Sequence, residues 1–272
     1  MPENPCLTKE MRSRMRGARG AVIQFVYVTL IIAVSGVMYT FFRLEWAGGS
    51  GAGANPAMAA EFGHALFIGI SVLQAGMVCL LAPAFTSGAI TGEREQRSLD
   101  MLLVTNLKAR SILLGKLGSA LGYIGLLIIS SVPVLSVCFL FGGVSPDELI
   151  AAYVLIGTTG VFFGLAGLFW SCVFRRTLQA TAAAYGTVAL LCIVVTVMDV
   201  LISELTRYSV DAPVLSYVNP IMGILSIVLP EADTSSWSVF GTVPLWVVTV
   251  SFQALAAPVL LGASILLLRY RQ

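Results

Sequence analysis

Six long stretches without Asp, Glu, Lys or Arg limit what this sequence can fold into. A hydrocarbon core about 30 Å thick needs roughly 20 apolar residues for each helical span, and every stretch reaches that length. With 57% hydrophobic residues and only 11% charged residues, the chain cannot bury its apolar surface in one water-soluble core. We therefore expect an all-α membrane protein with six transmembrane helices, at about residues 21–42, 65–91, 117–141, 149–174, 177–198 and 244–268.

The positions of the cations predict the orientation of these spans, because Lys and Arg resist translocation more than Asp and Glu do. Of the 16 Lys and Arg residues, 14 precede the first span, follow the last, or lie in the second and fourth connections. Only Arg43 and Arg207 lie in the other loops. We expect a multi-pass protein of the bacterial cytoplasmic (inner) membrane with both termini in the cytoplasm. The net charge of +2 then reflects topology and does not indicate nucleic-acid binding.

Residues 1–20 are predicted to form an interfacial helix that lies on the cytoplasmic face of the lipid bilayer. Apolar residues recur every three or four positions from Leu7 to Val22, which is typical of an amphipathic helix. The basic residues of the opposite side are Lys9, Arg12, Arg16 and Arg19. A generic positive-inside anchor would explain the charges but not the apolar spacing.

The sequence contains no recognisable catalytic or nucleotide-binding motif. There is one histidine, His64, so the zinc motif HExxH cannot occur. Gly115 and Lys116 lack the earlier glycine and the hydroxyl of a phosphate-binding loop, and no cysteine pair has metal-binding spacing. The six spans as drawn also contain no carboxylate for a proton or ion relay. We expect no enzyme activity, no metal and no cofactor in this chain itself.

The fourth span carries a stripe of glycines at helical spacing. Small residues let two helix backbones approach closely in a membrane, so this face is predicted to pack on a helix of this chain or of a second copy. The glycines concerned are Gly157, Gly160, Gly164 and Gly167.

The segment "GEREQRSLDMLL", Gly92 to Leu103, is a short charged interruption between the second and third spans. Helical spacing places Glu93, Arg97 and Asp100 on one face. The leucines of the other face are Leu99, Leu102 and Leu103. This pattern predicts an amphipathic cytoplasmic helix that bends away from the second span near Gly92 or at Ser98.

Glu95 is the exception in this segment, because it lies one turn before Leu99 on the largely apolar face. A carboxylate there is tolerable on an exposed helix end. It would be useful at a docking surface where a partner protein supplies a cation.

The longer segment "GEREQRSLDMLLVTNLKARSILLGKL", Gly92 to Leu117, resembles the membrane subunits of ATP-binding-cassette transporters of the type 2 permease class. The opening "NPCLTKEMRSRMRGARG" similarly resembles their interfacial elbow helix. The resemblance implies a single permease domain over residues 1–272, with a cytoplasmic coupling segment at 92–116 and an outer loop at 199–243. Within that loop, residues 213–230 are predicted either to re-enter the membrane as short helices or to cap the bundle.

The resemblance implies a role for individual residues of this sequence, position by position. Glu93, Arg94 and Glu95 match an ERE-type turn, and Leu99 to Leu103 match the short helix that docks on a cytoplasmic ATPase. Asn106 stands where many members have proline, and Asn219 with Pro220 resembles a pair found before the outer helices. The expected ATPase-coupling residues are Glu93, Arg94, Glu95, Arg97, Leu99, Asp100, Leu102 and Leu103.

The resemblance implies a permease subunit of an ATP-driven transporter. Two copies, or this chain and a homologue, would form the substrate pathway, and separate cytoplasmic ATPase subunits would bind ATP. Export is the usual direction in the family. The alternative is a membrane assembly or anchoring subunit that does not transport, in which the cytoplasmic helix is a static docking site.

Overall fold

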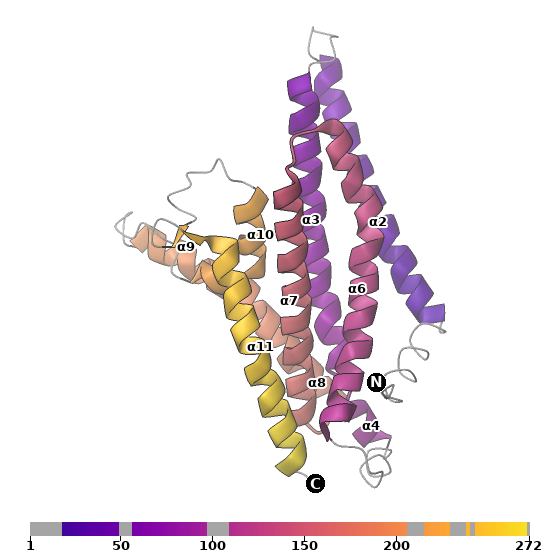
Figure 1. The fold of residues 1–272 in the computed structure, drawn as a ribbon, viewed down its shortest axis with the longest axis vertical. Coiled ribbons are helices and arrows are strands. Elements are labelled where there is room, and N and C mark those ends of the chain that lie inside the picture. Colours follow the sequence, from indigo (N-terminus) through magenta and orange to yellow (C-terminus); the bar gives the residue numbers. More distant parts are fainter. Residues whose placement is uncertain are drawn as a thin grey trace.

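The computed structural model describes residues 18–48, 56–96, 109–205, 215–228, 238–239 and 243–270. Six long helical segments form a bundle in this part of the chain, and each runs opposite to the one before it (Figure 1). The elements are α2 (Ala18–Gly48), α3 (Pro56–Thr86), α4 (Thr91–Glu95), α6 (Ala109–Phe141), α7 (Pro146–Val173), α8 (Thr177–Ala189), a π-helical segment (Leu190–Val194), α9 (Val195–Leu205), a 3₁₀ turn (Ser216–Val218), α10 (Pro220–Val228), β1 (Ser238–Val239), β2 (Val243–Pro244) and α11 (Leu245–Tyr270).

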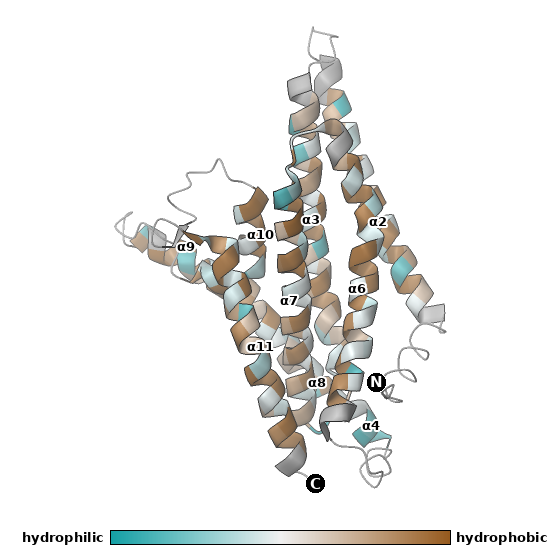
Figure 2. Cartoon of the chain, viewed as in Figure 1, coloured by the Kyte–Doolittle hydropathy of each residue, from teal (hydrophilic) through white to brown (hydrophobic). Residues whose placement is uncertain are grey.

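The prediction of an all-α protein with six transmembrane helices is confirmed. Six helices of the described chain are long and apolar enough to cross a membrane, and hydrophobic residues recur along these helices (Figure 2). The strands β1 and β2 form only a two-residue antiparallel hairpin. The 28 residues of α7 correspond to a helix of about 42 Å at 1.5 Å per residue, which exceeds the hydrocarbon core.

The centre of the bundle is the pair of helices α7 and α3, which run side by side through its middle (Figure 1). Within the most apolar window of each helix, 61% of residues are buried in α7 and 50% in α3, against 6% in the span that begins with α8. The helices α2, α6, α8, α10 and α11 pack around this pair. A helix that is apolar all round belongs in a protein core or in a bilayer. High burial identifies α7 and α3 as the core of the bundle, and low burial indicates that the span beginning with α8 faces lipid.

The turn between α6 and α7 fixes where α7 begins. Gly142 and Gly143 have positive φ angles of 79° and 85°, a conformation that costs glycine little. The Ser145 side chain accepts a hydrogen bond from the Glu148 backbone N–H, and the Glu148 carboxylate accepts one from the Ser145 N–H. This reciprocal capping arrangement, with Pro146 at the first helical position, stabilises the start of the most buried helix.

Two elements add detail to the sequence-based expectation. The helix of the second span is interrupted by a turn at residues 87–90, between the end of α3 at Thr86 and the start of α4 at Thr91. This turn lies close to Gly92, one of the two predicted positions of the bend, and the other, Ser98, lies outside the described residues. The fifth span continues through the π-helical segment into α9 as far as Leu205. A candidate span over Thr177–Ile202 therefore includes Asp199, which the drawn span had left out.

Some predictions fall on residues that the structure does not describe. Most of the predicted interfacial helix lies at residues 1–17, and Ala18 to Gly20 already belong to the start of α2. In the coupling segment, the residues outside the described chain are Arg97, Leu99, Asp100, Leu102 and Leu103, and Asn106 also lies outside it.

Three of the four glycines of α7 face neighbouring helices of the same chain. A Cβ atom on Gly160 would lie 3.2 Å from Val78 and 3.3 Å from Ile124. A Cβ atom on Gly164 would lie 3.4 Å from Leu121. Gly167 is the most restricted, because its Cβ would lie 3.1 Å from the Cα atom and 3.3 Å from the carbonyl oxygen of Pro83. Gly157 has no such neighbour within 4 Å.

We predict opposite effects of alanine at the two ends of this stripe. Gly167→Ala forces the α3 backbone away from α7, and overpacking of this kind costs about 1–3 kcal/mol. Gly157→Ala enters open space and removes a helix-weakening glycine, which favours the helix by up to about 1 kcal/mol. Apparent melting temperatures of the two detergent-solubilised variants, measured by size-exclusion chromatography after heating, test this. Equal melting temperatures would contradict the close approach of α7 and α3.

Candidate functional site

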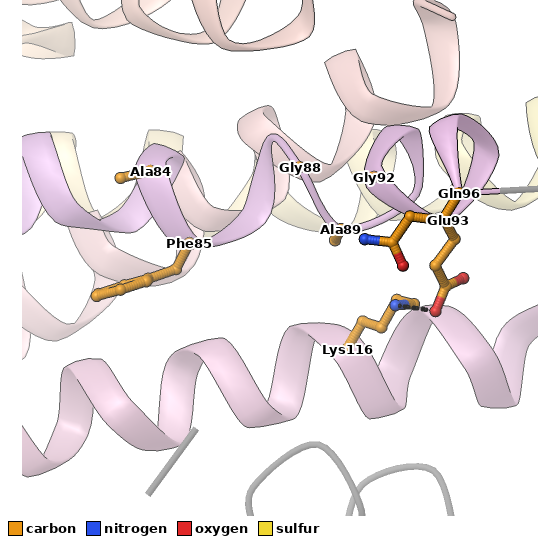
Figure 3. Close-up of a pocket in the computed structure, with 8 residues that line it drawn as sticks. All are labelled: Ala84, Phe85, Gly88, Ala89, Gly92, Glu93, Gln96 and Lys116. Carbon is orange, nitrogen blue, oxygen red and sulfur yellow. Dashed lines mark ion pairs between the residues drawn. The ribbon is translucent and has the colours of Figure 1, made fainter. Parts of the chain in front are cut away.

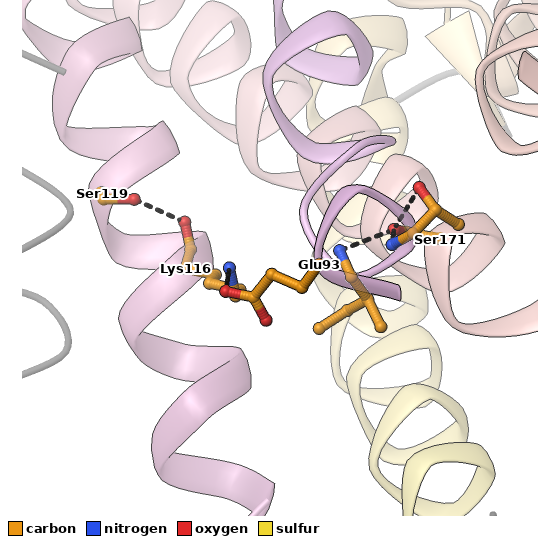
Figure 4. Close-up of polar contacts among 6 residues, drawn as sticks. Glu93, Lys116, Ser119 and Ser171 are labelled. Carbon is orange, nitrogen blue, oxygen red and sulfur yellow. Dashed lines mark hydrogen bonds and ion pairs between the residues drawn. The ribbon is translucent and has the colours of Figure 1, made fainter. Parts of the chain in front are cut away.

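The short helix α4 is held in place by a serine of α7. The Ser171 hydroxyl accepts hydrogen bonds from the backbone N–H groups of Ile90, at 2.9 Å, and Thr91, at 3.1 Å. These donors lie at the start of α4, where the helix has no side-chain cap of its own. Ser171 is fully buried, and Figure 4 shows it reaching from α7 to the first turn of α4. A helix five residues long is thus anchored to the central helix of the bundle.

Glu93 connects α4 to α6. Its Oε1 atom lies 2.7 Å from the Nζ atom of Lys116, and the two side chains point toward one another across the gap between the helices (Figure 3). The Lys116 side chain is only 5% exposed and that of Glu93 is 21% exposed. Because a buried ammonium group is costly without a counter-charge, this pair fixes the distance between α4 and α6.

Arg94 connects α4 to the end of α7. Its Nη1 atom donates a hydrogen bond of 2.9 Å to the backbone carbonyl of Phe174, the residue that follows the last turn of α7. Carbonyl groups at a helix C-terminus carry partial negative charge, so a guanidinium group is favourable there.

Glu95 connects α4 to the start of α8. Its Oε1 atom accepts a hydrogen bond of 2.8 Å from the backbone N–H of Thr177, the first residue of α8, whose own N-cap residue Arg176 makes no capping bond. The Thr177 N–H lowers the pKa of the Glu95 carboxyl, and the positive charge of Arg176 contributes in the same direction. A carboxylate at a helix N-terminus is favoured by the helix dipole.

This geometry changes the interpretation of Glu95. The sequence left open an exposed helix end or a cation from a partner protein. Glu95 is indeed exposed, and its observed partner is the N-terminus of a helix 82 residues away in the same chain. The carboxylate therefore has a role within the chain whether or not another protein docks nearby.

Three consecutive charged residues thus contact three different membrane helices. Glu93 reaches α6, Arg94 the end of α7, and Glu95 the start of α8. One more contact joins the same region, since the Ser87 and Thr181 hydroxyls lie 2.9 Å apart. We call Glu93, Arg94 and Glu95 together with their partners Lys116, Phe174 and Thr177 the α4 junction. Any displacement of α4 acts on all three helices at once.

A cavity of about 440 Å³ opens beside the junction, between the α3–α4 bend and α6. Figure 3 shows the Glu93, Gln96 and Lys116 side chains on its polar side and Phe85 on its apolar side. Its lining residues are Ala84, Phe85, Gly88, Ala89, Gly92, Glu93, Gln96 and Lys116. Within the described residues, no group of His, Cys, Asp and Glu side chains could hold a metal ion.

The Asn219–Pro220 pair lies at the other end of the bundle and positions α10. The Asn219 side-chain amide donates to the Cys192 carbonyl at 3.1 Å and to the Thr196 hydroxyl at 2.6 Å. Its side-chain oxygen accepts from the Ile221 N–H at 2.9 Å, and Pro220 begins the helix. Asn219 therefore caps α10 and joins it to the π-helical segment after α8.

Sequence reasoning missed several residues of these sites. Ser171 and Thr177 give no local signal, because a serine and a threonine in apolar helices are common and their bonding partners are about 80 residues distant. Asp199 was left outside the fifth span, yet its carboxylate accepts hydrogen bonds from the Leu215 N–H, at 3.0 Å, and from the Ser216 hydroxyl. The only feature of the sequence that could have pointed to Asp199 was the presence of a carboxylate near the end of an apolar run.

Comparison with known proteins identifies the family. The family model described as ABC-2 family transporter protein matches residues 5–269. The chain belongs to this family. It is therefore a multi-pass membrane protein of the permease type, with ABC-2 membrane proteins as its relatives. A search of the curated proteins found no match to the chain.

The Glu93–Lys116 pair should be worth more to stability than either charge alone. We expect Glu93→Gln to destabilise the protein by about 2–4 kcal/mol, because it leaves the buried Lys116 ammonium facing a neutral amide. The double variant Glu93→Gln with Lys116→Met should recover most of that loss. Melting temperatures of the wild type, both single variants and the double variant complete the cycle, with Glu61→Gln as an exposed control. Strictly additive losses would show that the two side chains do not interact.

The Glu95 contact should be sensitive to acid. Because the folded-state pKa is lowered from 4.5, the carboxylate stabilises the fold fully when the pH is well above 4.5, and this stabilisation is lost as the pH falls through the lowered value. Glu95→Gln keeps an oxygen that can accept from Thr177 but has no such pH dependence. The difference in melting temperature between wild type and Glu95→Gln should shrink on acidification. Glu95→Ala, which removes the acceptor, should melt lower at every pH. A difference that is constant down to acid pH would count against the contact.

Proposed function

We propose that this chain is the membrane-spanning permease subunit of an ATP-driven transporter of the ABC type, and that it acts as an exporter. Two copies, or this chain with a homologue, form the substrate pathway, and separate cytoplasmic ATPase subunits bind and hydrolyse ATP. The ATPases contact the segment from Gly92 to Leu103, with both chain termini on the same cytoplasmic side of the bacterial inner membrane.

The α4 junction is the observation that supports this proposal. A segment that transmits movement from an ATPase to the membrane helices must be exposed on one side and firmly connected to several of these helices on the other. The charged residues of α4 meet the second condition through α6, α7 and α8. The first residues after α4 are those predicted to dock, so a push on that segment would reach three helices through one rigid connection.

Nucleotide would then drive the cycle through the permease without binding to it. ATP favours the closed arrangement of the two ATPase subunits, and this preference can move the permease only if the two permease conformations hold the docked segment differently. The contacts of Glu93 with α6 and of Glu95 with α8 keep the docked segment attached to these two helices during that movement. Breaking these contacts should uncouple ATP hydrolysis from movement without removing the docking surface itself.

The alternative is a static anchoring subunit, in which α4 holds a cytoplasmic partner and nothing moves. Both proposals need a docked partner, and they differ in what nucleotide does. In the transporter, ATP binding changes distances between membrane helices of the assembled complex. In the anchor, those distances stay the same.

The test uses the full complex, in which the tagged chain is expressed in its native host and purified with its cytoplasmic partners. A spin label at Leu178, exposed at the start of α8, is placed on each copy in a background with the native cysteines replaced by alanine. We expect vanadate-trapped nucleotide to shift the distance between the two labels. The shift should disappear in Glu93→Gln with Glu95→Gln, although the ATPase still co-purifies.

The matched control places two neutral substitutions, Glu61→Gln and Glu204→Gln, on exposed acids outside the α4 junction. This variant should keep both co-purification and the distance shift. If no ATPase co-purifies, the transporter proposal fails. If an ATPase co-purifies but no shift occurs in the wild type, the anchoring function is the correct one.

A further inference from the structure

A second cavity, which shares no lining residue with the one beside the α4 junction, opens on the membrane side of the bundle. The helices α8 and α11 both pack on α7 but form no extensive interface with each other in the described chain. Between them lies a groove of about 510 Å³. We call it the α7 groove. Phe162, Phe169 and Trp170 of α7 form its floor, Phe252 and Val259 of α11 form one wall, and Thr187 of α8 lies in the other.

The lining of the α7 groove is hydrocarbon-like. The Trp170 indole N–H donates to the Thr187 hydroxyl at 2.9 Å, and that hydroxyl donates to the Ala183 carbonyl at 3.0 Å. The polar atoms of both side chains are therefore occupied, and they offer little to a polar substrate. On the α11 side, Val259 is 69% exposed and Phe252 is 39% exposed. An apolar, open-sided groove of this kind suits an alkyl chain.

The length of the groove matches one leaflet of a bilayer. Its floor runs from Phe162 to Trp170, about 12 Å of helix at 1.5 Å per residue, close to half of a hydrocarbon core of about 30 Å. One extended acyl chain spans this length.

The positively charged residues at the end of the groove indicate that the bound lipid has an anionic headgroup. Trp170 lies three residues before the end of α7 and stacks on Phe174, with ring centroids 5.7 Å apart. An amphipathic aromatic pair is typical of the boundary between hydrocarbon and headgroups. Directly beyond it, Arg175 and Arg176 are both exposed. Glu95 lies near Arg176 and offsets one of these two cations, so positive charge remains for an anionic headgroup.

We propose that the α7 groove is a binding site for one anionic glycerophospholipid, with an acyl chain against Trp170 and the headgroup phosphate at Arg175 and Arg176. The site lies in the leaflet on the side of the α7–α8 turn. It requires only that the protein resides in a membrane and does not depend on ATP coupling. A bound lipid at this position contacts α7, α8 and α11 together, and would stabilise their packing.

Trp170 provides a direct probe of the site. The variant with Trp46, Trp237 and Trp246 replaced by phenylalanine keeps Trp170 as the only tryptophan. The purified full chain is placed in nanodiscs of unlabelled phosphatidylcholine with an equal small fraction of acyl-brominated phosphatidylglycerol or acyl-brominated phosphatidylcholine. Bromine quenches tryptophan fluorescence at contact, so quenching reports occupancy of the groove. We expect at least threefold stronger quenching by the brominated phosphatidylglycerol.

Two further variants test the two halves of the site. Arg175→Gln with Arg176→Gln should make the two brominated lipids quench equally, whereas Arg43→Gln, remote from the groove, should keep the preference. Ala256→Phe should fill the groove and reduce quenching by both lipids. Ala254→Phe, on the same helix but outside the lining, should leave it unchanged.

Three outcomes would overturn the proposal. Equal quenching by the two lipids in the starting variant excludes recognition of the headgroup. A preference that survives removal of both arginines assigns it to another part of the protein. Absence of quenching by either lipid means that the groove is closed or covered by another occupant, such as a second copy of the chain.

Discussion

The ion pair between Glu93 and Lys116 determines where the short helix α4 lies against the membrane helices. Lys116 is nearly fully buried in α6, so its ammonium group must face a negative charge at close range. Glu93 supplies that charge from α4, and the backbone of the same short helix is held by Ser171 of α7. The position of α4 therefore follows from the charge balance of the bundle and from the fixed position of α7.

The helix α7 combines close packing against α3 and α6 with an end that holds α4. Gly160, Gly164 and Gly167 allow α3 and α6 to lie against it closely, while four residues beyond the last glycine Ser171 holds α4. A shift of α4 would be transmitted to α7 through the Ser171 hydrogen bonds, because closely packed interiors transmit strain. The stripe of glycines and the charged turn, which look unrelated in the sequence, act on the same helix.

Hydropathy and charge predicted the six membrane helices because these signals are local and repeated over 20 or more residues. The partners of the charged turn could not be predicted in the same way. Glu93, Arg94 and Glu95 are adjacent in sequence, yet they bond to residues 23, 80 and 82 positions later. Only the three-dimensional arrangement of α6, α7 and α8 brings those partners together. The glycine at position 92 indicated a break near this point, but the Ser171 hydrogen bonds that hold the turn at residues 87–90 come from a distant part of the chain and gave no local signal.

The helix α8 joins the α4 junction to the opposite end of the molecule. Its first N–H is bonded to Glu95, and the π-helical segment after its last residue presents the Cys192 carbonyl to Asn219. π-helical turns are rare and concentrate at functional sites, and this one lies where α9 departs from the bundle (Figure 1). Asn219 and Asp199 then join the 3₁₀ turn and α10 to α9, through hydrogen bonds to Thr196 and from Leu215. A rotation of α8 that starts at Glu95 would consequently reach α10, which packs against α3, α7 and α11. The two ends of the protein are thus connected through one helical segment, Thr177–Leu205, which is less buried against its own chain than α3 or α7.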